Sequence, residues 1–409
     1  MNRLLVITMA AVAASVAVAA DWPQWRGPDR TGVSKETGLL KAWPEAGPKL
    51  RWKITDLGTG YSSPVVVKGV VYIQTTRGGE EFVVALDEKT GKETWATKIG
   101  EVGKNRGPQY PGTRGTATVD GDFLYCLASD GELNCVGTDG KVKWHKNLKT
   151  DFSGEVGFWA YSESVLIDGD KLICTPGGKT ATLAALKKSD GSVIWKSEVP
   201  GGDIADYASI MPVEGGGHKQ YVQYMRKALV GVDAQTGKFL WKYTRTQDFG
   251  ASVLTPVVKD GKVFVSGSRT GGAVVKLEAD GDGVKPTEVF FEKAYGPSMG
   301  GAVLVDGHLY FTNSRQLFCV EFATGKEKWK DDCVGAASLC AADGMLYVRG
   351  WNGKLALVEV NAEKYVEKGR FDQPDKTKTT GWPHPIVANG GFYVRDMDTL
   401  LCFDVSAGK

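Results

Sequence analysis

Short runs of alternating apolar and polar residues recur along most of the chain, and each ends in a two-residue turn. They read SPVVVKG, TATVDG, SVLIDG, TPVVKDG, AVLVDG, LCAADG and HPIVANG, with turn glycines Gly69, Gly121, Gly169, Gly261, Gly307, Gly344 and Gly390. Asp-Gly and Asn-Gly pairs supply the positive φ angles of a tight hairpin. Each run therefore predicts a β-strand that turns directly into an antiparallel partner.

A second phrase follows these runs, in which a glycine precedes a tryptophan by four residues. The pairs are Gly91/Trp95, Gly140/Trp144, Gly191/Trp195, Gly237/Trp241 and Gly325/Trp329. Together the two phrases define a repeat of ~45 residues with four short strands, which is typical of a β-propeller. In the first unit the strands are predicted over residues 64–67, 70–75, 82–86 and 93–99. We expect the repeated tryptophans to pack between blades.

Seven complete units begin near Ser63, Thr116, Ser164, Ser209, Thr255, Ala302 and Leu339. An eighth, residues 384–405, contains only three strands. We expect residues 49–54 to supply its fourth strand, with Trp52 in the tryptophan position. The predicted fold over residues 49–409 is therefore an all-β, eight-bladed propeller of four-stranded antiparallel blades, closed by an N-terminal strand that leaves no open sheet edge.

The first twenty residues predict export. Arg3 precedes an apolar and small-residue stretch that ends in Ala-Val-Ala-Ala before Asp21, as in a cleavable signal over residues 1–20. A retained membrane anchor is the alternative, since the stretch is just short of a spanning helix. No cysteine precedes Cys126, which argues against a lipid-attached amino terminus. We expect a periplasmic or secreted monomer without a membrane anchor, with residues 21–48 as a lead-in extension.

Composition adds little beyond a large globular body, with 42% hydrophobic residues, 24% charged residues and 53 glycines. The formal net charge of +2 does not suggest nucleic acid as a partner. Among the seven cysteines, Cys135, Cys319 and Cys402 share one repeat position, as expected of a small buried residue. A turn at Asp130-Gly131 would place Cys126 opposite Cys135, so this pair is a candidate disulfide unless strand twist shifts the pairing.

Functional loops of a propeller converge on the face where strand connections meet around the channel. Aligned on the turn glycine, the entrance to each first strand is small or neutral except at Glu163 and His384. Aromatic residues recur just before it. Our ligand-face candidates are Tyr61, Arg114, Tyr161, Glu163, Tyr207, Trp382 and His384. These side chains suit a small polar ligand, and loop packing is the alternative interpretation.

Arginines recur eight residues after the turn glycine, at Arg77, Arg226, Arg269 and Arg315. Such an arc suits an anionic ligand or an acidic partner segment. Ordinary solvated turn arginines are the alternative.

The unit SPVVVKGVVYI…VVALDEKTGKETW resembles the pyrroloquinoline-quinone (PQQ) repeat of quinoprotein alcohol dehydrogenases and of the propeller lipoprotein of the outer-membrane barrel-assembly machinery. The resemblance covers roughly residues 49–405. The opening DWPQWRGPDRTGVS is similar to the lead-in of exported proteins of this class.

The dehydrogenase resemblance implies PQQ, calcium and paired adjacent cysteines. Adjacent cysteines are absent from the sequence. Glu163 and Asp206, with Asp203 nearby, are the weak candidates for a metal, and Arg114 for the cofactor's carboxylates. We therefore favour an exported binding or scaffolding propeller, with a protein partner or a small polar or anionic ligand at the funnel face and no confidently assigned cofactor. A PQQ-dependent alcohol or sugar dehydrogenase is the alternative, and a sugar- or polymer-handling funnel is a third.

Overall fold

The strand pattern of the sequence is realised throughout the computed structural model, which describes residues 20–104, 110, 112–248, 250–297 and 299–408. The predicted export signal, apart from its last residue, lies outside the described residues. In the described part of the chain every regular element is a strand. None of the described residues forms a helix long and apolar enough to cross a membrane.

The strands form eight blades, each built from four strands that are numbered from the channel outward except in the last blade. Blades 1 to 4 contain β3 (Val65–Val67), β4 (Val70–Arg77), β5 (Glu80–Asp87), β6 (Glu93–Glu101); β7 (Thr118–Asp120), β8 (Phe123–Leu127), β9 (Glu132–Gly137), β10 (Val142–Asn147); β11 (Leu166–Asp168), β12 (Lys171–Cys174), β13 (Leu183–Lys187), β14 (Val193–Ser197); and β15 (Met211–Gly215), β16 (His218–Tyr224), β17 (Leu229–Asp233), β18 (Phe239–Tyr243). Blades 5 to 8 contain β19 (Val257–Lys259), β20 (Lys262–Gly267), β21 (Gly271–Asp280), β22 (Gly283–Glu292); β23 (Ala302–Val305), β24 (His308–Thr312), β25 (Gln316–Glu321), β26 (Glu327–Asp332); β27 (Ala337–Ala342), β28 (Met345–Gly350), β29 (Lys354–Glu359), β30 (Glu367–Asp372); and β31 (Ile386–Ala388), β32 (Gly391–Asp396), β33 (Thr399–Asp404), β2 (Leu50–Ile54).

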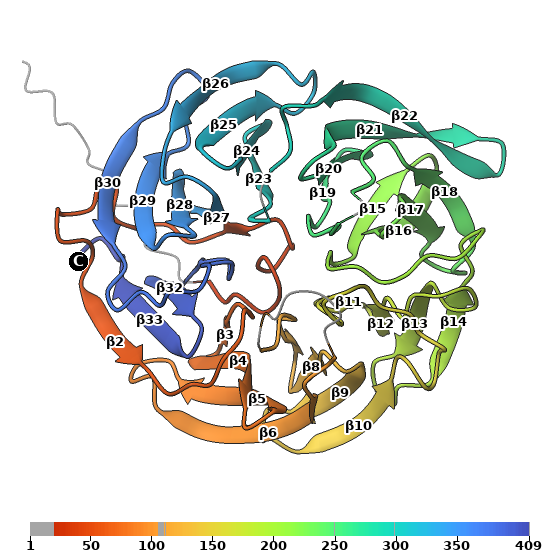
Figure 1. The fold of residues 1–409 in the computed structure, drawn as a ribbon, viewed down its shortest axis with the longest axis horizontal. Coiled ribbons are helices and arrows are strands. Elements are labelled where there is room, and N and C mark those ends of the chain that lie inside the picture. The colour runs from red at the N-terminus through yellow and green to blue at the C-terminus, as the bar shows by residue number, and fades with distance from the viewer. Residues whose placement is uncertain (1–19, 105–109, 111, 249, 298, 409) are drawn as a thin grey trace, which may run out of the picture.

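The predicted closure of the ring is confirmed. The N-terminal strand β2 pairs antiparallel with β33 and completes blade 8, with Trp52 opposite Cys402. Figure 1 shows the blades arranged in a ring, with β2 and β33, from the first and last parts of the chain, side by side. One strand was not anticipated, because β1 (Val33–Ser34) adds to blade 7 in parallel with β27.

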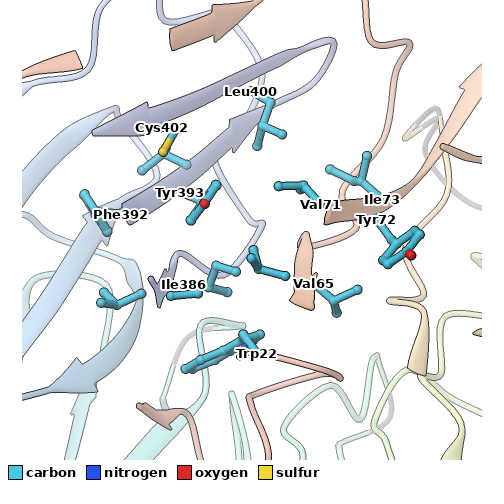
Figure 2. Packing of buried hydrophobic residues seen from close by; sticks show 14 of the residues in the cluster. Trp22, Val65, Val71, Tyr72, Ile73, Ile386, Phe392, Tyr393, Leu400 and Cys402 are labelled. Atoms are coloured by element: carbon cyan, nitrogen blue, oxygen red, sulfur yellow. The ribbon is translucent and has the colours of Figure 1, made fainter. Parts of the chain in front are cut away.

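The seam between blades 1 and 8 is filled by one continuous apolar cluster (Figure 2). Ile386 and Phe392 come from blade 8, and Val65 and Val71 come from blade 1. Trp22, from the lead-in, is also part of this cluster and is almost fully buried. The two ends of the chain are therefore joined by strand pairing and by hydrophobic packing.

Three of the five repeated tryptophans, Trp95, Trp144 and Trp195, pack onto the turn glycine of the next blade, which confirms the predicted role between blades at these positions. A Cβ on Gly237 would lie only 2.5 Å from a ring carbon of Trp195. The same contact joins Trp52 to Gly91, Trp95 to Gly140 and Trp144 to Gly191, and Phe290 replaces the tryptophan against Gly325. The indole nitrogens of Trp52, Trp95 and Trp144 also donate to backbone carbonyls of these turns, those of Glu88, Thr138 and Lys188.

The predicted opposition of Cys126 and Cys135 is wrong. Cys135 pairs with Tyr125, and Cys126 pairs with Asn134, so the two thiols lie one residue out of register. A shift of one residue sends a side chain to the other face of the sheet. Cys126 accordingly packs in the apolar cluster that extends from the seam through blade 1 to blade 2, Cys135 packs in the cluster on the other side of blade 2, and both are free.

The lead-in fills the central channel from the face opposite the strand connections that form the funnel. It enters beside the hairpin turn of blade 1, where Asp21 accepts a hydrogen bond from the Lys68 amide at 3.2 Å. It leaves beside the turn of blade 8, where Glu36 accepts from the Gly390 amide at 3.0 Å. Figure 1 shows this segment, in red, running into the centre of the ring. We call residues 21–36 the plug.

The contact of Trp195 with Gly237 predicts a specific stability effect. Gly237→Ala should destabilise the protein more than Gly69→Ala, because both glycines have positive φ (73° and 80°) but only a Cβ at 237 meets a neighbour within 4 Å. Chemical denaturation of the two variants measures the difference, which we expect to exceed about 1 kcal/mol for forced overpacking.

Trp195→Ala completes a double-mutant cycle with Gly237→Ala. Trp195→Ala alone should lower the unfolding free energy by ~3–5 kcal/mol. In the Trp195→Ala background, Gly237→Ala should lower it by no more than Gly69→Ala does. The control is Ile194→Ala, since Ile194 is 37% exposed on the same strand. Full additivity of the two variants at 195 and 237 would contradict the inter-blade contact.

Candidate functional site

A cavity of about 660 Å³ lies in the funnel, where the connections between blades meet above the plug. The pairing of the two innermost strands identifies equivalent wall residues in the eight blades. Tyr61 stands four residues before Val65, the residue of β3 that pairs with Tyr72. The equivalent residue of every blade lines the cavity: Tyr61, Arg114, Ser162, Tyr207, Val253, Met299, Ala336 and Trp382. The site is thus a ring to which all eight blades contribute.

Two residues further along, blades 1 to 5 carry hydroxyl side chains that link neighbouring blades. The Thr116 amide donates to Ser164 Oγ at 2.9 Å, and the Ser164 amide donates to Ser209 Oγ at 3.0 Å. The Ser63 amide donates in the same way to Thr116 Oγ1 at 3.2 Å. These three bonds link blades 1 to 4 to one another just below the cavity wall.

Of the predicted ligand-face residues, five line the cavity and two do not. Tyr61, Arg114, Tyr207, Trp382 and His384 line it.

Tyr161 and Glu163 are excluded by register. Gly69 is the second residue of its hairpin turn, whereas Gly169 is the first, between Asp168 and Lys171. Alignment on the glycines therefore displaced blade 3 by one residue, which reverses the face on which a side chain lies. The residues that occupy the two ring positions are Ser162 and Ser164, and both line the cavity.

Glu163 and Tyr161 are instead structural. The Glu163 carboxylate is buried and accepts hydrogen bonds from the Thr175 amide at 2.8 Å and from Thr175 Oγ1 at 2.9 Å. Burial raises its pKa to about 8, against the lowering effect of these hydrogen bonds and of Arg30. The Tyr161 hydroxyl donates to the Pro176 carbonyl at 2.8 Å.

Aromatic side chains cover one half of the cavity wall. Trp382 contacts Tyr61 and Tyr110, with ring centroids 5.0 and 4.7 Å apart. Trp159 continues the series, at 6.2 Å from Tyr110 and 5.5 Å from Tyr207. We call these five residues the aromatic arc. Sequence alignment missed Tyr110 and Trp159, because both lie in connections of irregular length that have no fixed place in the repeat.

Arg114 braces the aromatic arc. Its guanidinium donates to the Trp159 carbonyl at 2.8 Å and to the Tyr110 carbonyl at 2.6 Å. Burial lowers its pKa, although its charge is partly stabilised by Tyr61 and Glu81 nearby. Arg114 therefore positions two aromatic side chains from different connections.

The tip of the plug forms the floor. Trp25 donates from Nε1 to Thr255 Oγ1 at 3.0 Å, and its ring meets His384 edge-on with centroids 4.7 Å apart. Arg26 is buried and donates to the Ala302 and Thr31 carbonyls. Burial, with Arg26 and Arg349 nearby, lowers the pKa of His384 to about 3, so this imidazole is neutral at physiological pH.

The four arginines of the predicted arc do not act together. Arg77 pairs with Glu93 at 2.7 Å, and Arg315 pairs with Asp332 at 2.8 Å. Arg226 pairs with buried Asp206 at 2.8 Å. Arg269 differs, since it lines the cavity, is exposed, and forms no ion pair with any described residue.

The donor set does not fit a calcium ion with a quinone cofactor. Asp206 is held by Arg226, and Glu163 is held by Thr175. The Asp203 carboxylate accepts from the Lys227 and Ile204 amides. The described residues contain no group of three or more histidine, cysteine or acidic side chains arranged to hold a metal. Calcium prefers six or more oxygen ligands, which these carboxylates do not provide together.

These features define the class as a closed eight-bladed propeller with a plugged channel and a funnel cavity. The family model described as outer membrane protein assembly factor BamB matches residues 26–103, 79–330 and 288–409. The chain belongs to this family of PQQ-like propellers.

Solved structures show the same fold. Quinohemoprotein alcohol dehydrogenase from Comamonas testosteroni is similar with a TM-score of 0.65 and 14% identity, over 95% of this chain and 81% of that one. BamB from Moraxella catarrhalis is similar with a TM-score of 0.63 and 14% identity, over 89% of this chain and 99% of that one. Polyvinylalcohol dehydrogenase from Pseudomonas sp is 29% identical over 129 residues, a match that spans 31% of this chain and only 18% of that protein.

The buried Glu163 carboxyl predicts a pH-dependent stability. The unfolded side chain ionises near 4.5 and the folded one near 8, so its favourable contribution is present below pH 4.5 and lost as pH rises to 8. Glu163→Gln removes this titration. The unfolding free energy of the Glu163→Gln variant minus that of the native chain should be about 1–3 kcal/mol larger at pH 8 than at pH 5, because only the native chain loses stability over this range. Urea unfolding at both values measures it, and an equal difference at both would contradict the assignment.

The plug is predicted to stabilise the ring. Arg30 is 2% exposed and donates to the Ser164 carbonyl at 2.7 Å and the Val165 carbonyl at 3.1 Å. Arg30→Met should lower the unfolding free energy by about 1–3 kcal/mol, because it leaves buried acceptors unpaired. Lys35→Met is the control, since the Lys35 side chain is 64% exposed. Equal thermal unfolding of the two variants would show that the plug adds no stability.

Proposed function

We propose that this chain works outside the cytoplasm as a binding propeller that takes its ligand or a partner segment in the funnel cavity. The observation that carries the proposal is the cavity itself, about 660 Å³, closed below by the plug and lined from all eight blades. That volume is within the range of small-molecule sites, which are concave, mainly apolar and carry a few placed polar groups. Membership of a family described by an outer-membrane assembly factor supports a binding role.

The chemistry of the lining favours binding over acid–base catalysis. A general acid or base works best with a pKa near the operating pH. His384 is held neutral by a pKa of about 3, and the lining's carboxylate, Asp248, accepts hydrogen bonds from Ser268 Oγ and the Arg269 amide. Burial raises the pKa of Glu81 to about 7 and that of Glu163 to about 8, but neither carboxyl lines the cavity.

A PQQ-dependent alcohol or sugar dehydrogenase is the competing function, and the partial match to polyvinylalcohol dehydrogenase is the observation that favours it. The calcium ion that accompanies PQQ would need several oxygen ligands close together, and the described carboxylates do not provide them. The two functions make opposite predictions for the same protein.

The test is a titration of the mature protein with PQQ, with and without calcium, followed by quinone absorbance, thermal unfolding and reduction of an electron-acceptor dye in the presence of ethanol. We expect no calcium-dependent binding and no dye reduction. Saturable calcium-dependent binding with dye reduction would overturn the proposal in favour of the dehydrogenase.

A second arm tests binding directly. Citrate, a hexaglutamate peptide and trigalacturonic acid are each titrated while tryptophan fluorescence is recorded. We expect saturable quenching by at least one probe, and at least tenfold weaker binding in Trp382→Ala, which removes one ring of the aromatic arc. Absence of a response to all three probes would overturn a ligand-binding funnel.

A further inference from the structure

The funnel cavity is divided into an aromatic half and a cationic half. The aromatic arc comes from the connections that lead into blades 8, 1, 2, 3 and 4. Trp351 of blade 7 extends the aromatic side, with its ring centroid 6.3 Å from that of Trp382. Across the cavity, blades 5 and 6 contribute Arg269, Lys293 and Asn313, together with the small ring residue Val253. A ligand that fills this space meets flat apolar faces on one side and charged or polar groups on the other.

The charge of the lining is positive. Its charged residues are Arg26, Arg114, Asp248, Arg269 and Lys293. Arg26 and Arg114 are committed to backbone carbonyls, and Asp248 is committed to the loop that carries Arg269. Arg269 and Lys293 are exposed and form no ion pair with the described residues, so both cations are free to meet an anion.

The aromatic arc does not form a slot for a flat ligand. Neighbouring rings are inclined by 40° between Tyr61 and Trp382, 53° between Tyr110 and Trp159, and 58° between Trp159 and Tyr207. A planar aromatic ligand is best held between parallel faces, as in the offset stacking of aromatic pairs. Tilted rings along a curved wall instead suit a chain of puckered rings, each of which presents an apolar C–H face to a different aromatic side chain.

The lining also contains buried polar atoms without a protein partner. Trp382 Nε1, Trp351 Nε1 and Ser162 Oγ have no hydrogen-bond partner among the described residues. These three atoms have almost no accessible surface, so the cavity presents the ring faces of Trp351 and Trp382, rather than their N–H groups, to a ligand.

We propose that the funnel cavity binds an acidic oligosaccharide, whose sugar rings stack along the aromatic arc while its carboxylates face Arg269 and Lys293. This inference rests on the proposed binding function and names its ligand class. Carboxylate pairing with a guanidinium gives both charge and hydrogen-bond geometry, so Arg269 is expected to contribute most of the charge selectivity.

The experiment is isothermal titration of the mature protein with trigalacturonic acid and, as the uncharged match, its methyl ester. We expect the acid to bind at least tenfold more tightly than the ester. Arg269→Ala should weaken binding of the acid by about tenfold and leave the ester unaffected. Trp159→Ala should weaken both ligands, since it removes a stacking face rather than a charge.

Arg315→Ala is the matched control. Arg315 occupies the same repeat position in the next blade, but it is paired with Asp332 and does not line the cavity. The Arg315→Ala variant should bind trigalacturonic acid within about twofold of the native affinity, because solvent screens the charge of the exposed Arg315 side chain.

Three outcomes would overturn the ligand class. These are equal binding of acid and ester, equal effects of Arg269→Ala and Arg315→Ala, and binding of hexaglutamate or citrate without binding of the trimer. The last result would leave the proposed binding function standing with a different anion as ligand. If neither trigalacturonic acid, hexaglutamate nor citrate binds, the proposed binding function itself is contradicted.

Discussion

The ring depends on one repeated contact, in which a large aromatic side chain of an outer strand covers a turn glycine of the neighbouring blade. At Gly237 the glycine meets two demands, a positive φ and the absence of a Cβ that would strike Trp195. The contact joins blade 8 to blade 1, each of blades 1 to 3 to the next blade, and blade 5 to blade 6. It packs these neighbouring blades directly against each other below the funnel-face connections.

Pairing of β2 with β33 closes the ring, and the plug closes one end of its channel. Strand β2 joins the first part of the chain to the last blade and gives that blade its fourth strand. The plug then turns an open channel into a cavity with a floor. It is held by buried guanidinium groups of Arg26 and Arg30, whose hydrogen bonds reach carbonyls on opposite parts of the ring.

The ring and the plug together determine where chemistry is possible. Buried carboxylates such as Glu163 and Asp206 are committed to hydrogen bonds or an ion pair within the walls. The cavity keeps aromatic faces and two exposed cations. The blades therefore hold the buried ionisable groups, whereas the connections, whose lengths vary from blade to blade, form the cavity wall.

The sequence alone determined the architecture, because strand alternation, turn chemistry and the glycine–tryptophan spacing are local and recur along the chain, in seven strand-and-turn runs and five glycine–tryptophan pairs. It also located Tyr61, Tyr207, Trp382 and His384 correctly at the cavity. Tertiary structure decided the rest. A hairpin glycine is equally suited to either turn position, so only strand pairing shows that Ser162, and not Tyr161, faces the cavity. The path of the plug and the meeting of Tyr110 with Trp159 depend on packing between distant segments, which no local pattern encodes.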